Sequence, residues 1–383
     1  MSDYEYRGPE PLNREPELKE LLSNYITVKD PYDRNHGPIP HLNVSEHIVV
    51  VDGAVSERLT LTINQLKNDF NQHEVLCALQ CAGNRRHTMR TKIKEVQGID
   101  WLDGAVMNCV WKGPRLRDVL EKAKIDVTMR DKDTGEYTGY TEFACFEQEV
   151  QKDRWYGGSI ELQRAMNPDA EVILALEMNG KPLTAEHGAP VRAIVPGVAG
   201  ARSVKWLDRI TVQREHSKNF YQQHDYKILP PEVTDQTIAD EYWQKVPPMT
   251  DMPVNSSIGV PEDGAVVKAD SEGLVEVRGY AVPHGSDGPV QRVEVSGDGG
   301  KTWVDAELDF GGYGDPRDVK SRPKIKWAWC LWTAKVKVPL GKGQRIVSRA
   351  TDCGGHTQEE QGTWNLRGVA YNGWGEVRNL TVI

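Results

Sequence analysis

The regular pattern of apolar and polar residues starts near residue 47, after a stretch rich in proline and charge. That first stretch is expected to be an extended arm that wraps a domain, with one short helix at PELKELLSN. HIVVVDGAV and LTLTINQL then predict two strands, followed by a short helix at about 62–70. VLCALQCAG predicts a buried strand that ends at a glycine turn. In GPRLRDVLEKAKI, the spacing of Leu116, Val119, Leu120 and Ala123 predicts a helix.

Further along, the pattern alternates strands with turns rather than strands with helices. VILALEMNG predicts a strand that runs into an Asn-Gly turn. VRAIVPGVAGARSVKWLDRITV predicts a strand, a glycine-rich loop and a second strand. The region is therefore expected to be an irregular α+β fold and not a series of βαβ units.

The pattern changes near residues 245–260, where KVPPMTDMPVNSSIG has the prolines and small polar residues of a linker. Beyond it, VEVRGYAV, QRVEVSGDGGKTWVDAEL, KWAWCLWTAKVKV and QRIVSRATD predict short strands joined by turns. About 120 residues of this kind are typical of an all-β immunoglobulin-like sandwich. We predict an α+β domain over 1–245 and a sandwich over 246–383, within the two or three domains that a chain of 383 residues allows.

Composition excludes some classes of partner. The formal net charge of −9 argues against nonspecific nucleic-acid binding, which needs a basic face. No apolar run approaches the length of a membrane span, so no membrane partner is expected. The acidic start MSDYEYRGPEPLNREPELKE does not fit a secretory signal or a mitochondrial presequence, and the final TVI is not a peroxisomal address. A cytoplasmic location is expected, with the peroxisome and the mitochondrial intermembrane space as alternatives.

Cys81 lies in LQCAGNRRHTMR, close to two arginines. The six cysteines form no CxxC pair and are expected to be mostly reduced thiols. Nearby cations favour the thiolate, so the pKa of Cys81 is expected to fall. From the local residues alone, Cys81 is about equally well explained as a small buried side chain or as a functional thiolate, either metal ligand or nucleophile.

Several other loops combine basic residues with glycine or proline. They are RNHGPIP at 34–40, EHGAPVR at 186–192, PGVAGARSVKWL at 196–207, DYK at 225–227 and WNLRGV at 364–369. Each loop alone has an ordinary explanation as a solvated turn or a surface charge. Together with a soft thiolate, they offer what an anionic, phosphate-bearing metal cofactor requires.

These motifs together resemble the sulfite oxidase family of molybdenum-cofactor enzymes, and the resemblance is closest to its haem-free plant-type form. It runs from RNHGPIP through LQCAGNRR and GARSVKWL to WNLRGV. It implies an α+β molybdenum-cofactor domain followed by an immunoglobulin-like dimerisation domain, and hence a homodimer. It also implies Mo-molybdopterin as the cofactor and, because the chain has no HPGG motif, no haem.

The resemblance also implies roles for individual residues. Cys81 would ligate molybdenum beside the dithiolene of the pterin. The substrate pocket would be lined by Arg34, Arg86, Arg367, Tyr226 with Asp225 beside it, and Trp101. The molybdopterin and its phosphate would be held by Tyr32, Asp33, Arg34, Asn35, His36, His187, Arg192, Ser203, Val204 and Lys205, and by the segment Cys145, Phe146 and Glu147.

Two positions depart from the family pattern. Gln97 stands where the family often has Lys or Arg, so the substrate channel is expected to carry one positive charge less. Glu147 stands where a cofactor-contacting segment usually ends in Asp, which leaves that segment's role open.

The implied activity is oxidation of sulfite to sulfate by oxygen-atom transfer, with electrons passed to oxygen or to cytochrome c. A nitrate-reducing molybdenum domain is the alternative, because that related group shares the cysteine. It typically has Met at the position of Arg367 and replaces the tyrosine of DYK, whereas this chain keeps Arg367 and Tyr226. A further guanidinium favours the more highly charged anion, sulfite. A non-catalytic cofactor-binding or interaction module is a second alternative.

Overall fold

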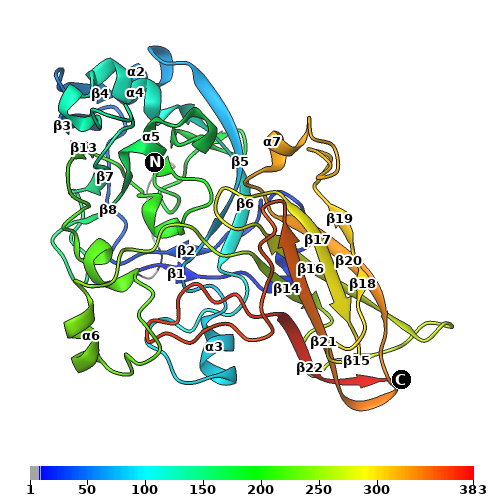
Figure 1. Cartoon of the computed structure of the whole chain (residues 1–383). Helices are drawn as coiled ribbons and strands as arrows, with labels where there is room; N and C mark the ends of the chain where they lie inside the picture. Colours follow the sequence, from blue (N-terminus) through cyan, green and yellow to red (C-terminus); the bar gives the residue numbers. More distant parts are fainter. Residues whose placement is uncertain (1–7, 9) are drawn as a thin grey trace.

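The computed structural model describes residue 8 and residues 10–383 of the chain. Two bodies lie side by side, an α+β part with the first sheets and a sheet-rich part that ends at the C-terminus (Figure 1). The α+β class and the separate β-rich unit that the sequence predicted are confirmed. No helix among the described residues is long and apolar enough to cross a membrane.

The first part contains a five-stranded sheet in the order β4-β3-β13-β7-β8. Its central strand β13 pairs parallel to β3 and antiparallel to β7, so the sheet is mixed. Three short helices bury their apolar faces with this sheet in one hydrophobic core. The elements are β3 Ile48–Gly53, β4 Leu59–Thr62, β7 Tyr140–Cys145, β8 Tyr156–Glu161 and β13 Arg209–Gln213, with helices α2 Ile63–Asn68, α4 Leu116–Ala123 and α5 Leu162–Met166.

A second sheet of this part carries the motif around Cys81. Its order is β11-β10-β6-β5, and the long antiparallel pair β5 and β6 runs from Gln72 opposite Pro114 to Gln80 opposite Val106. Cys81 therefore follows the last paired residue of β5, as the sequence predicted. The elements are β5 Gln72–Gln80, β6 Val106–Pro114, β10 Glu177–Met178 and β11 Lys181–Pro182, beside the pair β9 Ile173–Ala175 and β12 Arg192–Ile194.

Local sequence signals explain several of these elements. All four residues of the predicted apolar face in α4 are buried. Helix α2 starts with a capping box in which Thr62 and Gln65 satisfy each other's backbone N–H groups. Asn179 and Gly180 both have positive φ and form the two-residue turn between β10 and β11.

The C-terminal part packs two antiparallel sheets face to face, the predicted sandwich. One has the order β14-β16-β20-β19 and the other β15-β22-β21-β17-β18, with only the β15–β22 pair parallel. Between them lies one hydrophobic core. The strands are β14 Asn255–Val260, β15 Val266–Val267, β16 Leu274–Val282, β17 Val290–Ser296, β18 Val304–Asp305, β19 Glu307–Asp309, β20 Cys330–Lys337, β21 Gly341–Asp352 and β22 Gly375–Val382.

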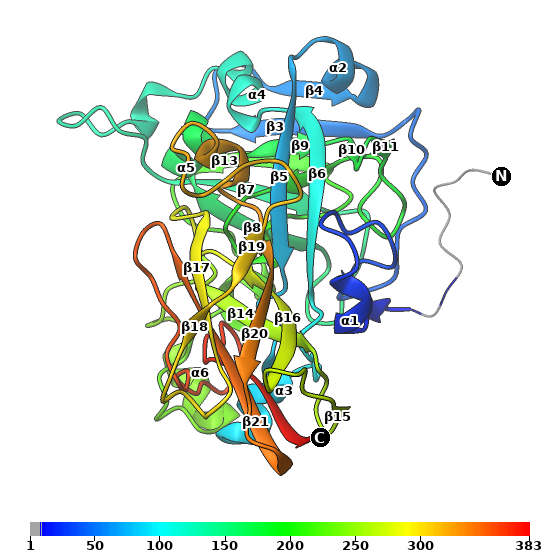
Figure 2. The same cartoon turned by 90° about the vertical axis from the view of Figure 1, so that its right-hand side faces the viewer.

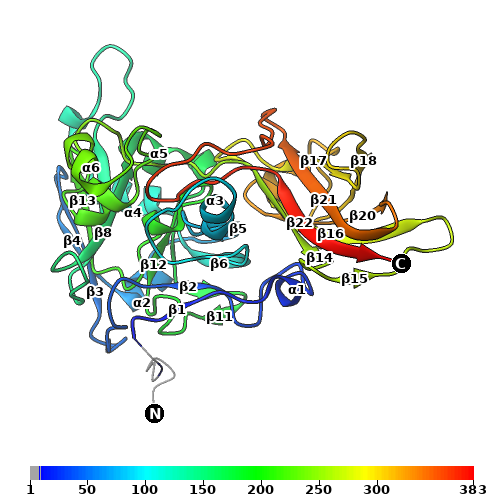
Figure 3. The same ribbon diagram turned by 90° about the horizontal axis from the view of Figure 1, so that it is seen from below.

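Two segments pack against the part of the molecule on the other side of the predicted boundary at 245/246, so the two parts share contacts across that boundary. The N-terminal arm places α1 against the sandwich (Figure 2), where Tyr25 and Trp329 exchange hydrogen bonds of 3.1 and 2.9 Å. Conversely, the stretch before β22 leaves the sandwich and reaches α3 of the first part (Figure 3). The remaining α-helices and strands are α1 Leu18–Leu21, α3 Arg86–Lys92, α6 Gln236–Tyr242 and α7 Arg322–Ile325, and the strand pair β1 Asn13–Arg14 and β2 Asp33–Arg34.

Candidate active site

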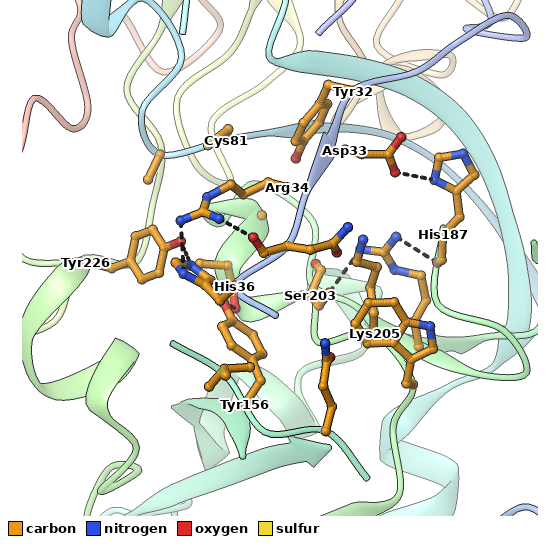
Figure 4. A pocket seen from close by; sticks show the side chains of 18 of the residues that line it. Tyr32, Asp33, Arg34, His36, Cys81, Tyr156, His187, Ser203, Lys205 and Tyr226 are labelled. Carbon is orange, nitrogen blue, oxygen red and sulfur yellow. Dashed lines mark hydrogen bonds and ion pairs between the residues drawn. The ribbon is translucent and has the colours of Figure 1, made fainter. Parts of the chain in front are cut away.

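A cavity lies between β2, the turn after β5 and the loops at 187–206 (Figure 4). Distant loops that the sequence singled out as basic therefore meet at one place. The predicted residues that line it are Tyr32, Asp33, Arg34, Asn35, His36, Cys81, His187, Arg192, Ser203, Lys205 and Tyr226.

Cys81 lies at the end of β5 with its backbone fixed, because its N–H donates to the carbonyl of Ala105 at 2.9 Å. Burial raises the pKa of the Cys81 thiol, while Arg86, the N–H of Gly83 and Arg34 act in the opposite direction. The expectation of a lowered pKa is therefore wrong for the thiol in this structure. The predicted cations are present, but the loss of hydration outweighs them. A bound metal ion would displace the proton and stabilise the thiolate.

Arg86 begins helix α3 and is enclosed by three glycines. A Cβ atom at Gly83, Gly98 or Gly368 would lie 2.5 to 2.8 Å from carbon atoms of the Arg86 side chain. The guanidinium donates to the carbonyls of Ile99 at 2.7 Å and Arg367 at 3.1 Å. Burial lowers its pKa to about 10, so it remains charged at neutral pH. Because these acceptors are uncharged, the positive charge remains available to an anion near Cys81.

A hydrogen-bonded chain fixes the proton positions on the other side of the cavity. Arg34 Nη2 lies 2.9 Å from His36 Nδ1, and His36 Nε2 lies 2.8 Å from the Tyr226 hydroxyl. Burial, with Arg34 adding to it, lowers the pKa of His36 well below its ordinary value, so the ring is neutral. Arginine can only donate, so Nδ1 accepts and Nε2 carries the proton. The Tyr226 oxygen thus accepts from His36, which leaves its own O–H free to donate.

Arg367 reaches the site from the C-terminal part, in the segment that lies beside α3. Its guanidinium lies 3.0 Å from the Asp225 carboxylate and 3.2 Å from the Gln97 side-chain oxygen. Its Nε atom is buried without a partner. Gln97, the departure from the family pattern, thus holds Arg367 instead of adding a charge.

At the other end of the cavity, basic side chains surround Asp33. His187 Nδ1 lies 3.5 Å from Asp33, and Arg192 donates to the carbonyls of His187 at 3.0 Å and Ser203 at 2.9 Å. Burial lowers the pKa of Lys205 to about 7 and that of His187 to about 3. Loss of hydration is the main cause of both shifts, and neighbouring cations add to it.

Unpaired polar atoms test whether this chain fits molybdopterin, a polar pterin that carries a phosphate. Asn35 Oδ1, Gln148 Nε2 and Arg192 Nε are buried, have no hydrogen-bond partner, and belong to residues that line the cavity. Buried polar groups are normally paired, so these atoms are suited to a polar ligand. The thiol of Cys81 supplies a soft metal ligand at one end and Lys205 a cation at the other. The residues present therefore fit the cofactor.

Five predicted residues are placed differently. Cys145 points into the hydrophobic core because it ends β7 on the core-facing side. Phe146 and Glu147 line a separate hollow beside His41, and their N–H groups bind Asp208. This segment therefore does not belong to the candidate site. Val204 is buried in the core and Trp101 packs in a cluster with Cys81, and neither lines the cavity.

Arg86, Asp225 and Arg367 do not line the cavity either, although they adjoin its wall through Tyr226 and Cys81.

The structure adds residues that no motif indicated. Gln148 and Tyr156 follow β7 and start β8, and only the pairing of these strands brings them to the cavity. Gly200 lies in a motif that the sequence did single out, and a Cβ there would approach the Tyr32 hydroxyl to 2.7 Å.

Comparison with known proteins agrees with both parts. The model of the oxidoreductase molybdopterin binding domain matches residues 36–221, and that of the Mo-co oxidoreductase dimerisation domain matches residues 246–380. The sulfane dehydrogenase SoxCD from Paracoccus pantotrophus has a similar fold, with a TM-score of 0.71, 22% identity and coverage of 97% of this chain and 90% of that one.

Curated relatives are similar over almost the whole chain. Mitochondrial sulfite oxidase of Homo sapiens is 42% identical over 96% of this chain, and the chain spans 64% of that protein's length. Sulfite oxidase of Arabidopsis thaliana is 39% identical over 96% of this chain and 91% of its own length. A nitrate reductase of Solanum lycopersicum is 35% identical over 97% of this chain but 40% of its own length. The chain belongs to the sulfite oxidase family of molybdopterin-binding oxidoreductases.

Proposed function

We propose that this protein oxidises sulfite to sulfate at a molybdenum centre held by molybdopterin. The observation that carries the proposal is the set of three arginines, Arg34, Arg86 and Arg367, gathered around Cys81 and Tyr226. The one carboxylate paired with them is Asp225 on Arg367, as far as the described residues show. The cluster therefore keeps about two net positive charges, which match the two negative charges of fully ionised sulfite.

The cofactor, when bound, supplies the exchange of one oxygen atom and two electrons with the substrate. Cys81 would hold the metal through its thiolate. Arg192, Lys205 and the unpaired atoms of Asn35 and Gln148 would hold the pterin and its phosphate. Overall, sulfite and one water give sulfate, two protons and two electrons, so the site must bind a dianion and release protons.

The protein's own contribution is to position and neutralise the anion. Arg86 is locked by its glycines and by two carbonyls, so it offers its charge without having to reorganise. Tyr226 has a free O–H directed by His36, which can donate to one sulfite oxygen. Burial raises the pKa of Tyr226 to about 12, so the hydroxyl stays protonated at neutral pH.

Nitrate reduction is the second candidate, because a nitrate reductase is among the relatives. Nitrate carries one negative charge, so it gains less from a third guanidinium than sulfite does. Arg367 is anchored on both sides, by Asp225 and by Gln97, which is the arrangement of a residue that binds a ligand at a fixed position. This favours sulfite. A non-catalytic module is disfavoured because such a module has no need of the buried charge of Arg86, which donates to two backbone carbonyls and to no carboxylate among the described residues.

We further propose a homodimer, since the C-terminal part matches a dimerisation domain. We propose oxygen or cytochrome c as the electron acceptor. These assignments are supported by family membership and by the acidic net charge of −9, which suits a basic cytochrome.

The test of the proposed function is a steady-state assay of molybdenum-loaded protein. Sulfite-dependent reduction of ferricyanide is measured beside nitrate reduction by a reduced viologen dye. Sulfite turnover without nitrate turnover is expected. Nitrate turnover without sulfite turnover would transfer the assignment to the nitrate-reducing alternative, and no turnover with metal bound would favour the non-catalytic module.

A further inference from the structure

A second group of potential metal ligands lies in the C-terminal sandwich, outside the cavity described above. His284 and Asp287 belong to the loop between β16 and β17, and His356 belongs to the loop after β21. One ligand atom from each of these three residues lies within 4.8 Å of the other two. None of the three lines the molybdopterin cavity.

The distances between these atoms suit a shared ion. His284 Nδ1 lies 3.0 Å and His356 Nε2 lies 3.1 Å from the same oxygen, Asp287 Oδ2. Donors bound at about 2.0–2.2 Å to a tetrahedral metal ion are separated by roughly 3.3 Å. The two imidazole rings lie close together, with centroids 4.1 Å apart and a tilt of 30°. Only a small movement would bring all three atoms to bonding distance.

A buried carboxylate holds the two histidines in place. Asp352, the last residue of β21, is fully buried, and its two oxygens accept the backbone N–H groups of His284 and His356, each at 3.0 Å. Asp352 also pairs with Val290 at the start of β17, so the two loops are neighbours by strand register. Burying a carboxylate is costly unless it is well hydrogen-bonded. Here that cost is offset by bonds that fix both ligand-bearing backbones.

The third ligand is fixed as well. The N–H of Asp287 donates to the carbonyl of His284 at 2.9 Å, and the N–H of Gly354 donates to the carbonyl of Asp287 at 3.1 Å. A Cβ on Gly354 would lie 2.5 Å from the Asp287 Cβ, so this approach requires glycine. The backbone therefore holds all three ligands before any ion arrives, and pre-organisation favours binding.

We propose that His284, Asp287 and His356 bind a divalent first-row transition-metal ion such as Zn²⁺. Two imidazole nitrogens and one carboxylate oxygen suit such an ion, and water would complete its coordination. Between about a third and a half of each ligand side chain is exposed, so the ion can enter directly from solvent. The bound ion links the β16–β17 loop to the loop after β21 and stiffens this edge of the sandwich.

The test uses the full chain loaded with molybdenum, so that Cys81 is not free to take up zinc. Titration with Zn²⁺ followed by calorimetry is expected to give one site per chain. His284→Gln, Asp287→Asn and His356→Gln should each weaken that site by roughly tenfold or more, because each removes one of three protein ligands. His73→Gln is the matched control, since His73 also lies near a partly exposed carboxylate, that of Asp118 at 3.9 Å.

Zinc K-edge absorption spectroscopy of the one-to-one complex identifies the ligands directly. Two imidazoles and no sulfur are expected. Absence of a site in the parent protein, equal binding by His356→Gln, equal weakening by His73→Gln, or a sulfur ligand such as Cys353 would each overturn the proposal. Circular dichroism of the metal-free variants shows whether they are folded, so that lost binding is not confused with lost structure.

Discussion

Replacing Arg367 with methionine tests the substrate assignment most specifically. The side chain is largely buried, with 18% exposed, and its guanidinium is held by Asp225 at 3.0 Å and by Gln97 at 3.2 Å. Arg367→Met keeps an unbranched apolar stem of similar shape and removes the charge. The substitution also leaves Asp225 without its cation, so the site loses a positive charge and exposes a negative one to the substrate.

The expected size follows from the lost contact. A hydrogen bond to a charged group contributes about 1.5–3 kcal/mol, and we take about 2 kcal/mol for a dianion bound by several donors. That corresponds to a rise of roughly 30-fold in the KM for sulfite, with a smaller effect on kcat. The unpaired Asp225 adds repulsion, so the double variant Arg367→Met, Asp225→Asn should recover part of the loss.

Steady-state ferricyanide assays at fixed ionic strength measure these effects, because salt screens charge interactions. Arg317→Met is the matched control, since Arg317 is an exposed arginine paired with Asp315 at 2.7 Å in the sandwich. Its KM for sulfite should equal that of the parent protein. An unchanged KM in Arg367→Met, with molybdenum content equal to the parent, would refute the reasoning that the third guanidinium selects sulfite.

Four further predictions concern the metal ligand and the residues that position the side chains of the site. Cys81→Ser should lose most of its molybdenum, because a hydroxyl does not replace a soft thiolate ligand, whereas Cys353→Ser should retain it; metal analysis per chain decides. His36→Leu removes the donor to Tyr226 and the acceptor of Arg34, so kcat/KM for sulfite should fall by roughly tenfold or more, and an unchanged value contradicts the hydrogen-bonded chain. Gly83→Ala would place a Cβ 2.5 Å from the Arg86 guanidinium carbon, so kcat/KM should drop in protein that circular dichroism shows to be folded. Equal activity would show that Arg86 can move without cost. The pKa of His187 is lowered to about 3 in the folded state, so between about pH 6.5 and 3 the unfolded chain binds one proton more and the free energy of unfolding falls as pH falls. Urea unfolding from pH 6 to 4.5 should show that this free energy depends on pH less steeply in His187→Gln, by about 1.4 kcal/mol per pH unit. Equal pH dependence in the two proteins would contradict the burial of a neutral His187.

The sequence was informative where local patterns determine structure. The apolar spacing of Leu116, Val119, Leu120 and Ala123 predicted α4, and the Asn179-Gly180 pair predicted a turn, because both depend on neighbouring residues. The family motifs likewise identified most of the predicted residues that line the cavity, because each motif is a short local segment with its own backbone conformation. The predicted cytoplasmic location stays a prediction.

Other features depend on contacts between distant residues, and the sequence could not supply them. His36 and Tyr226 are 190 positions apart, so the hydrogen bond that fixes the tyrosine proton emerges only from the fold. The pKa of Cys81 was expected to fall because its charged neighbours are visible in the sequence, whereas the extent to which the fold removes water from the thiol is not. Cys145 ends β7 on the side that faces the core, whereas Gln148 lies in the loop after β7 and lines the cavity. The path of this loop depends on the fold around it, so the sequence motif placed the contact three residues too early.

The most direct test of the central claim is a single-turnover experiment without oxygen. Molybdenum-loaded protein in its oxidised form is mixed with excess sulfite, and sulfate is measured by ion chromatography. The account predicts one sulfate per molybdenum, formed without any added electron acceptor, and a further sulfate only after reoxidation. Sulfite bound but no sulfate formed by fully loaded protein would contradict the claim that this cavity oxidises sulfite.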